Sequence, residues 1–227
     1  MYYVWETRVR RPTDVIVPNF PAAPGGERVS FLTGRRLLTK LPEVEISYSA
    51  HSPCTLTDDL VIHKRRCLVH SNRLVETLRR AGVDSIDYYA CRLFNEATRA
   101  SDGTYQVANL LDVVFCLDRE NSELDIDDEE PTEIWSIDSM KLLEDRLGDS
   151  LMFRLGERRK TVIVHESVKA AVEREGLSGP VFLPVEGYRE YGGGQANNPI
   201  NLIGTHDLDP DGEAGFWLDE ERDSHEP

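Results

Sequence analysis

Short runs of β-branched and aromatic residues recur along the chain and are typical of strands. The first run lies within Met1–Val9 and ends at Arg10-Arg11-Pro12, so a strand is expected at the start of the sequence. From Pro12 to about Pro53, prolines and glycines interrupt the pattern repeatedly. This region is therefore expected to form loops and short, irregular strands.

A helical spacing of apolar residues begins after Ser71. Leu74, Leu78 and Ala81 recur at intervals of three or four residues, and Gly82 follows two arginines. This arrangement predicts a helix that Ser71 caps and Gly82 ends. Two long apolar stretches then surround a Ser-Asp-Gly turn at 101–103, which predicts a β-hairpin of residues 86–94 and 105–117.

The remaining elements are expected to be short. The acidic stretch 118–130 ends at Pro131 and is expected to be a loop, followed by a strand at 133–137 and a helix at 139–147. The last elements are strands at 151–155 and 161–164, a helix that begins after Val164 and ends at Gly176, and a strand at 181–184.

Strands grouped around two or three isolated helices, without regular β-α-β alternation, indicate an α+β fold. The strands are expected to be mostly antiparallel. A chain of 227 residues can form one such domain with a tail. Residues 1–184 are assigned to a single domain. Residues 185–227 are rich in glycine and acids and can bury little apolar surface, so they are expected to form a flexible tail.

The net charge of −15 is concentrated in two segments. Residues 118–145 hold 12 acids against two bases, and residues 185–227 hold 11 acids against two bases, while the rest of the chain is mildly basic. Such a field repels nucleic acid and attracts a basic protein. The alternative is that both segments are solvated loops that keep the protein soluble.

Several classes of protein are disfavoured. The longest apolar runs, such as Val113–Leu117, are far shorter than the roughly 20 residues that cross a bilayer. The first residues place bases after apolar side chains, the reverse of a secretory signal, so a cytoplasmic location and no membrane partner are expected. Four widely spaced cysteines without a histidine cluster indicate buried thiols rather than a metal site: Cys54, Cys67, Cys91 and Cys116.

The sequence offers little catalytic chemistry. It has no nucleophile elbow and no phosphate-binding glycine loop, so no catalytic residue and no cofactor are expected. His165 with Glu166 is a weak acid–base pair, and a carboxylate at a helix start is the simpler explanation. The run Asp207–Gly212 matches the first half of a calcium loop, but Leu218 stands where the bidentate Glu belongs. Calcium binding there is left open.

Three stretches carry a family resemblance. They are residues 71–78 (SNRLVETL), residues 107–121 (VANLLDVVFCLDREN), and the succession of strand, strand, helix and short strand from Phe153 to Pro184. On these residues the chain resembles Imm11, an immunity-protein family of bacterial polymorphic toxin systems. The match is clearest over 60–184, and its hydrophobic motifs bring no catalytic residues with them.

The resemblance implies a non-catalytic protein that binds and neutralises a cognate toxin, often a nuclease-type effector, and so protects the producing cell. A nuclease needs a basic surface to hold its substrate, and an acidic segment is suited to occupy that surface. The predicted partner-binding residues are Asp125, Asp127, Asp128, Glu129, Glu130 and, as an aromatic anchor, Trp135.

Each of these residues has a simpler alternative: a solvated loop for the acids, and a core position for Trp135. Two other functions also remain open at this point, a non-catalytic acidic adaptor for another protein and an enzyme of unfamiliar type. The sequence leaves open which toxin is bound and what the oligomeric state is.

Overall fold

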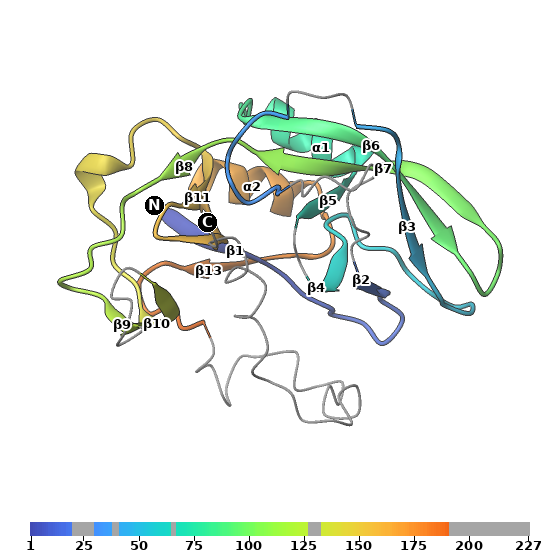
Figure 1. Cartoon of the computed structure of the whole chain (residues 1–227), viewed down its shortest axis with the longest axis horizontal. Helices are drawn as coiled ribbons and strands as arrows, with labels where there is room; N and C mark the ends of the chain where they lie inside the picture. The colour runs from blue at the N-terminus through green and yellow to red at the C-terminus, as the bar shows by residue number, and fades with distance from the viewer. Residues whose placement is uncertain (20–29, 38–40, 65–66, 127–132, 191–227) are drawn as a thin grey trace, which may run out of the picture.

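The computed structural model describes residues 1–19, 30–37, 41–64, 67–126 and 133–190. Its largest sheet has the strand order β13-β1-β12-β11-β8 (Figure 1). β1 (Tyr2–Thr7) lies between β12 (Arg158–His165) and β13 (Pro180–Pro184), and it is antiparallel to both. β11 (Met152–Leu155) pairs antiparallel with β12 and parallel with β8 (Val113–Val114).

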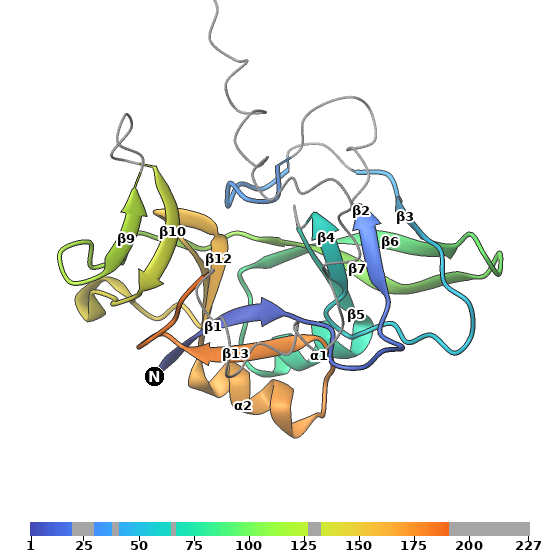
Figure 2. The ribbon, with the colours of Figure 1, turned by 90° about the horizontal axis from the view of Figure 1, so that it is seen from below.

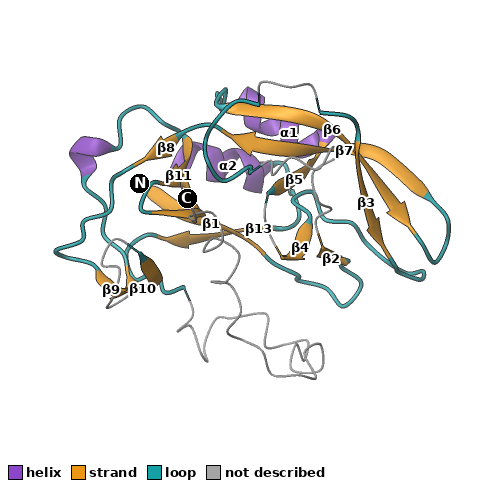
Figure 3. Cartoon of the chain, in the orientation of Figure 1, coloured by secondary structure: helices purple, strands orange, loops and turns teal. Residues whose placement is uncertain are grey.

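A second sheet has four strands in the order β3-β6-β7-β5 (Figure 3). Its strands are β3 (Val44–Tyr48), β6 (Ile86–Asn95), β7 (Ser101–Leu110) and β5 (Leu68–Ser71). Two small two-stranded sheets pair β2 (Ile16–Asn19) with β4 (Val61–Lys64), and β9 (Glu123–Ile126) with β10 (Ile134–Ser139). Most pairs are antiparallel.

The two helices, α1 (Asn72–Arg80) and α2 (Glu166–Arg174), lie side by side (Figure 2). Both contribute to one buried cluster, with Leu74 and Leu78 from α1 and Val168 and Val172 from α2. The same cluster includes Trp5, Val162 and Val164 of the five-stranded sheet and Ala108 and Leu110 of the four-stranded sheet. The helices therefore join the two sheets, and the predicted α+β class is confirmed.

The predicted ends of both helices agree with the structure. The hydroxyl oxygen of Ser71 accepts a hydrogen bond from the Leu74 N–H, the arrangement of an N-cap. After α1, Gly82 adopts a φ of 88° and Val83 N–H bonds back to Leu78, which is the αL ending that glycine favours. The second helix ends in the same way at Gly176.

Three sequence-based boundaries are wrong, and each has a local cause. The expected turn at 101–103 lies inside β7, where Asp102 Oδ1 accepts from Thr104 N–H and the register against β6 shifts by one residue. An Asp-Gly pair suits such a bulge as well as a turn. The β6–β7 turn lies instead at 96–100, where Arg99 has a φ of 62°.

The acidic stretch is not entirely loop, since β9 occupies 123–126. The expected helix at 139–147 is reduced to a single 3-10 turn at Glu144–Arg146. Residues before that turn pair with another segment: Asp118 N–H bonds to Lys141, and Leu143 N–H bonds to Cys116. This extended pairing takes the backbone groups that a helix would need.

The packed part of the chain continues beyond Pro184. Val185 is 8% exposed and Tyr188 is 5% exposed, and both belong to a core cluster with Val4, Phe153 and Leu155. The sequence prediction placed these residues in the tail. Residues 191–227, the larger part of that tail, lie outside the described residues.

Candidate functional site

The strands β9 and β10 form a hairpin at the end of the molecule away from the β6–β7 turn (Figure 1). Ile134 pairs with Ile126, and Ile137 pairs with Leu124. Ile134 and Ile137 are buried, so these pairs mark the inner side of the hairpin. At two places, three residues of β10 lie opposite two residues of β9, so the register shifts twice. Trp135 and Asp138 are the extra residues of these two β-bulges.

The opposite side of the hairpin is acidic and carries one large aromatic ring. Glu123, Asp125 and Asp138 are exposed, and Trp135 is 44% exposed. Asp125 pairs with Ser136, the residue next to Trp135, so the bulge places Trp135 beside this pair of residues. No Lys or Arg lies on 123–126 or 134–139.

The predicted site residues therefore have different outcomes. Asp125 and Trp135 are both exposed at neighbouring positions of the hairpin, and Trp135 is not a core residue. Asp127, Asp128, Glu129 and Glu130 lie outside the described residues. Glu123 and Asp138 share the acidic face but were not predicted. The signal for Glu123 was present in the alternation Glu-Leu-Asp-Ile at 123–126, whereas a bulge at Asp138 leaves no such pattern.

An ion pair helps to hold the hairpin against the body of the protein. Arg158, at the start of β12, donates two hydrogen bonds of 2.6 and 2.7 Å to the carboxylate of Glu190. The remaining guanidinium nitrogen of Arg158, Nη1, donates to the Ile134 carbonyl at 2.7 Å. Glu190 also donates its own N–H to the Ile137 carbonyl at 2.8 Å. Ile134, the first residue of β10, and Ile137 within the strand are thus bonded to residues outside the hairpin.

A further carboxylate lies just before β9. The side chain of Asn121 donates to Asp118 Oδ2 at 2.8 Å, and its N–H donates to Oδ1 at 3.2 Å. These hydrogen bonds lower the pKa of Asp118, the Asn121 side chain being the largest cause. The carboxylate is therefore held ionised beside the acidic hairpin.

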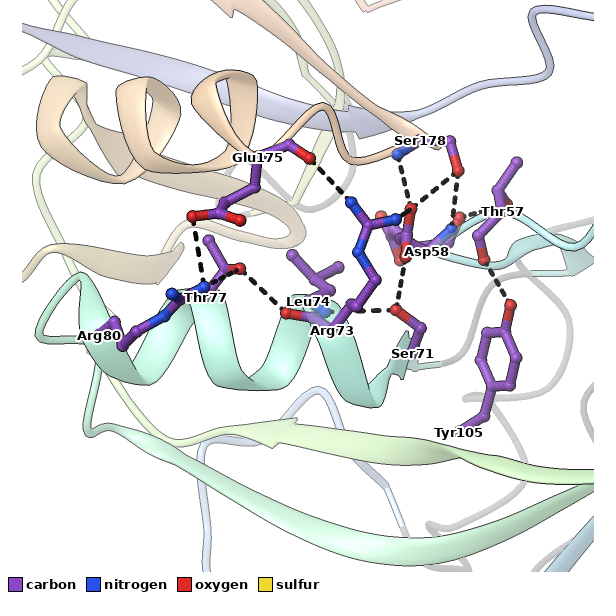
Figure 4. Close-up of polar contacts among 11 residues, drawn as sticks. Thr57, Asp58, Ser71, Arg73, Leu74, Thr77, Arg80, Tyr105, Glu175 and Ser178 are labelled. Carbon is purple, nitrogen blue, oxygen red and sulfur yellow. Dashed lines mark hydrogen bonds and ion pairs between the residues drawn. The ribbon is translucent and has the colours of Figure 1, made fainter.

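A separate polar cluster surrounds Asp58, between α1 and the turn after α2 (Figure 4). Asp58 Oδ1 accepts from the Ser71 hydroxyl at 2.7 Å, and Oδ2 accepts from Ser178 N–H at 2.9 Å and from its hydroxyl at 3.0 Å. Arg73 lies 3.8 Å from the same carboxylate and donates to the Glu175 carbonyl. Both serine hydroxyls donate to the carboxylate, so the cluster joins elements and does not present a nucleophile.

The neighbouring residue Asp59 is fully buried. Its Oδ2 accepts from the Trp5 indole N–H at 2.7 Å and from the Thr7 hydroxyl, and its Oδ1 lies 3.7 Å from His70 Nε2. His70 Nδ1 in turn lies 3.2 Å from the Tyr88 hydroxyl. Burial raises the pKa of Tyr88, which keeps its hydroxyl protonated. These polar contacts, which run from Trp5 through Asp59 and His70 to Tyr88, connect the five-stranded sheet to the four-stranded sheet.

The weaker chemical candidates have structural explanations. His165 is the N-cap of α2, where its Nδ1 accepts from Ser167 N–H at 3.3 Å. Cys67, Cys91 and Cys116 are buried thiols, and Cys54 is an exposed one. Burial raises the pKa of Cys91 and of Cys116 to about 12. The calcium-like run 207–212 lies outside the described residues.

Across the described ranges, no group of three or more His, Cys, Asp and Glu side chains is arranged to hold a metal ion. In the same part of the chain, each helix is too short or too polar to cross a membrane.

Comparison with known families gives one result. The model of an immunity protein family, Imm11, matches residues 7–187. That range includes the five-stranded sheet from Thr7 onward, both helices and the acidic hairpin. No curated protein matches the chain.

Proposed function

Because the chain belongs to the Imm11 immunity protein family, we propose that it binds and neutralises a cognate bacterial toxin through the outer face of the β9–β10 hairpin. The toxin is a nuclease-type effector with a basic surface, and the complex protects the producing cell in its cytoplasm. The carrying observation is the exposed set Glu123, Asp125, Asp138 and Trp135 on a hairpin without a basic residue.

The chemistry of the two surfaces supports this pairing. A nuclease binds phosphate with Lys and Arg side chains, and carboxylates on an inhibitor compete for the same groups. Complementary charge also raises the association rate, and salt weakens this effect. The sequence adds four acids between the strands, at positions 127–130. These four stay a prediction from the sequence.

Trp135 contributes what charge alone does not. Exposed carboxylate pairs contribute little net binding energy, whereas a desolvated aromatic ring at the centre of an interface often contributes most of it. In the free protein almost half of the Trp135 side chain meets water. We therefore assign orientation and association rate to the acids, and slow dissociation to Trp135.

The test is co-expression with the toxin encoded by the neighbouring gene, followed by measurement of growth and of binding to the purified, catalytically inactivated toxin. The variants are Asp125→Lys with Glu123→Lys, and Trp135→Ala. Glu96→Lys is the matched control, since Glu96 is an exposed carboxylate in the distant β6–β7 turn. We expect the double Lys variant to slow association and lose its salt dependence, Trp135→Ala to speed dissociation, and the control to behave as wild type.

The outcomes separate the alternatives. Wild-type rescue that all three variants preserve would keep the immunity role and move the binding surface elsewhere. Failure of the wild-type protein to rescue growth or to bind would contradict the pairing, and would favour an acidic adaptor for another protein.

A further inference from the structure

The hairpin of β9 and β10 has two edges with different surroundings. β10 lies between β9 and β12 (Figure 2), and among the described residues no strand borders the other side of β9. On the β10 edge, the Ile134 carbonyl accepts a hydrogen bond from the Arg158 side chain. The Ile137 carbonyl accepts one from Glu190 N–H on the same edge. Both carbonyls of β10 therefore point away from β9.

The register of the hairpin fixes the direction of the backbone groups on β9. In an antiparallel pair, two residues opposite each other either both turn their N–H and C=O groups toward the partner strand or both turn them away. Ile134 lies opposite Ile126, and Ile137 lies opposite Leu124. Leu124 and Ile126 therefore turn their backbone groups outward, and Asp125 between them turns its own toward β10.

The outward edge of β9 can accept one more strand. It presents the N–H and C=O groups of Leu124 and Ile126, and within the described ranges no backbone group from outside the hairpin bonds to them. Their side chains are half-buried on the inner side of the hairpin, while Glu123 and Asp125 are exposed. An added strand would therefore extend the inner side with its apolar residues and meet carboxylates with the residues between them.

The charge on this edge favours a basic strand over a second copy of the chain. Glu123 and Asp125 are exposed, and neither forms an ion pair with the described part of the chain. The exposed bases Arg119 and Lys141 lie before β9 and after β10, outside both strands. Two copies joined along this edge would place carboxylates opposite carboxylates, which destabilises cross-strand pairs, whereas Lys or Arg at the matching positions would stabilise them.

We infer that a strand of the toxin adds to the outward edge of β9, with basic residues opposite Glu123 and Asp125 and apolar residues along the inner side. This inference rests on the proposed function and specifies how the hairpin binds the toxin. Main-chain hydrogen bonds to Leu124 and Ile126 contribute affinity, and the alternation of basic and apolar residues in the added strand contributes specificity.

The first test is amide hydrogen exchange, measured by NMR at single residues in the free protein and in its complex with the catalytically inactivated toxin. The N–H groups of Leu124 and Ile126 are the probes, and the N–H of Asp125, which points toward β10, is the matched control. We expect exchange at both probes to slow by at least about 100-fold in the complex, and exchange at Asp125 to be slow in both states.

The second test separates the N–H group of Ile126 from its side chain. Ile126→Pro removes an outward N–H, a change that an edge strand tolerates, whereas Ile126→Ala shortens the side chain and keeps the N–H. We expect Ile126→Pro to bind the inactivated toxin about tenfold more weakly than Ile126→Ala in calorimetry. The two variants should melt within about 4 °C of each other. If Ile126→Pro does not fold, hydrogen exchange in the wild-type complex decides the question.

A complex in which Leu124 and Ile126 exchange as fast as in the free protein would overturn the inference and leave the proposed function intact. Equal affinities of Ile126→Pro and Ile126→Ala would do the same. Protection in the free protein that rises with its concentration would also overturn the inference, because a second copy would then occupy the edge. Absence of a wild-type complex would instead count against the proposed function.

Discussion

The ion pair between Arg158 and Glu190 gives a quantitative test of how the hairpin is held. Their side chains are 12% and 14% exposed, and they share two hydrogen bonds. Removing one partner of a buried pair costs about 3 to 5 kcal/mol, because the other charge stays desolvated. Because both side chains keep some exposure to water, we expect a cost near the lower end of this range of energies. Glu190→Ala should therefore lower the free energy of unfolding by about 3 kcal/mol.

The double-mutant cycle separates the pair from the surrounding contacts. Arg158→Met is expected to cost about 3 kcal/mol on its own, and the double variant about 4 kcal/mol, which gives a coupling energy of about 2 kcal/mol. The free energies come from urea unfolding with the m-value checked for each variant. The control cycle uses Lys169 and Glu173, an exposed i, i+4 pair on α2, with an expected coupling of about 0.3 to 0.5 kcal/mol.

A coupling energy for Arg158 and Glu190 no larger than that of the control pair would refute this reasoning. It would mean that the hairpin is held by the apolar contacts of Ile134 and Ile137 and that the ion pair adds only orientation. If the coupling is as large as expected, Glu190→Ala should also speed dissociation of the toxin, because Arg158, which donates to the Ile134 carbonyl of β10, loses the carboxylate that positions it.

Three further outcomes follow from other parts of the structure. The raised pKa values of Cys91 and Cys116, about 12 each, mean that the unfolded chain loses these protons above about pH 9 while the folded chain keeps them. Stability should therefore fall with rising pH by up to about 1.4 kcal/mol per unit for each thiol. The difference between urea midpoints at pH 8 and 10.5 should shrink in a double Cys→Ala variant, and the part that remains comes from Tyr88, Tyr105 and Tyr188, whose pKa values burial also raises. Gly179→Ala should cost more than about 3 kcal/mol, since Gly179 has a φ of 100° and its Cβ would overlap the Asp59 carbonyl. Gly148→Ala, with φ 57° and open space, should cost only about 1 kcal/mol by the same unfolding assay. Ser71→Ala should cost about 1 to 2 kcal/mol, with a smaller loss indicating that Asp58 satisfies the helix end without it.

The elements predicted correctly from the sequence are those whose signal is local. Ser71 and Gly82 define α1 by capping chemistry alone, and β1 and β12 are dense in β-branched or aromatic residues. The errors at 101–103 and 139–147 arise because distant partners decide the outcome there. Asp102-Gly103 becomes a bulge only because β6 pairs with it, and Lys141 is extended only because Asp118 bonds to it.

In the candidate site too, residue types could be predicted from the sequence, whereas the arrangement of the residues depends on partners distant in the chain. Asp125 and Trp135 could be singled out from charge and residue type, but their neighbouring positions on the hairpin depend on a bulge that no periodicity shows. The Phe115 ring packs over Gly156, which is 41 residues away in sequence and adjacent in space. We also propose that the domain extends at least to Glu190, because Tyr188 and Glu190 acquire their partners only in the folded chain.

The position of β1 between β12 and β13 has a consequence for protein synthesis. The ribosome makes β1 about 150 residues before the first strand that borders it, which at 5 to 20 residues per second is a delay of roughly 8 to 30 s. During this interval Val4 and Trp5 have no sheet to join. The five-stranded sheet, and with it the body that supports the hairpin, therefore closes only late in translation. A cell that depends on this protein would gain from starting its translation before that of the toxin.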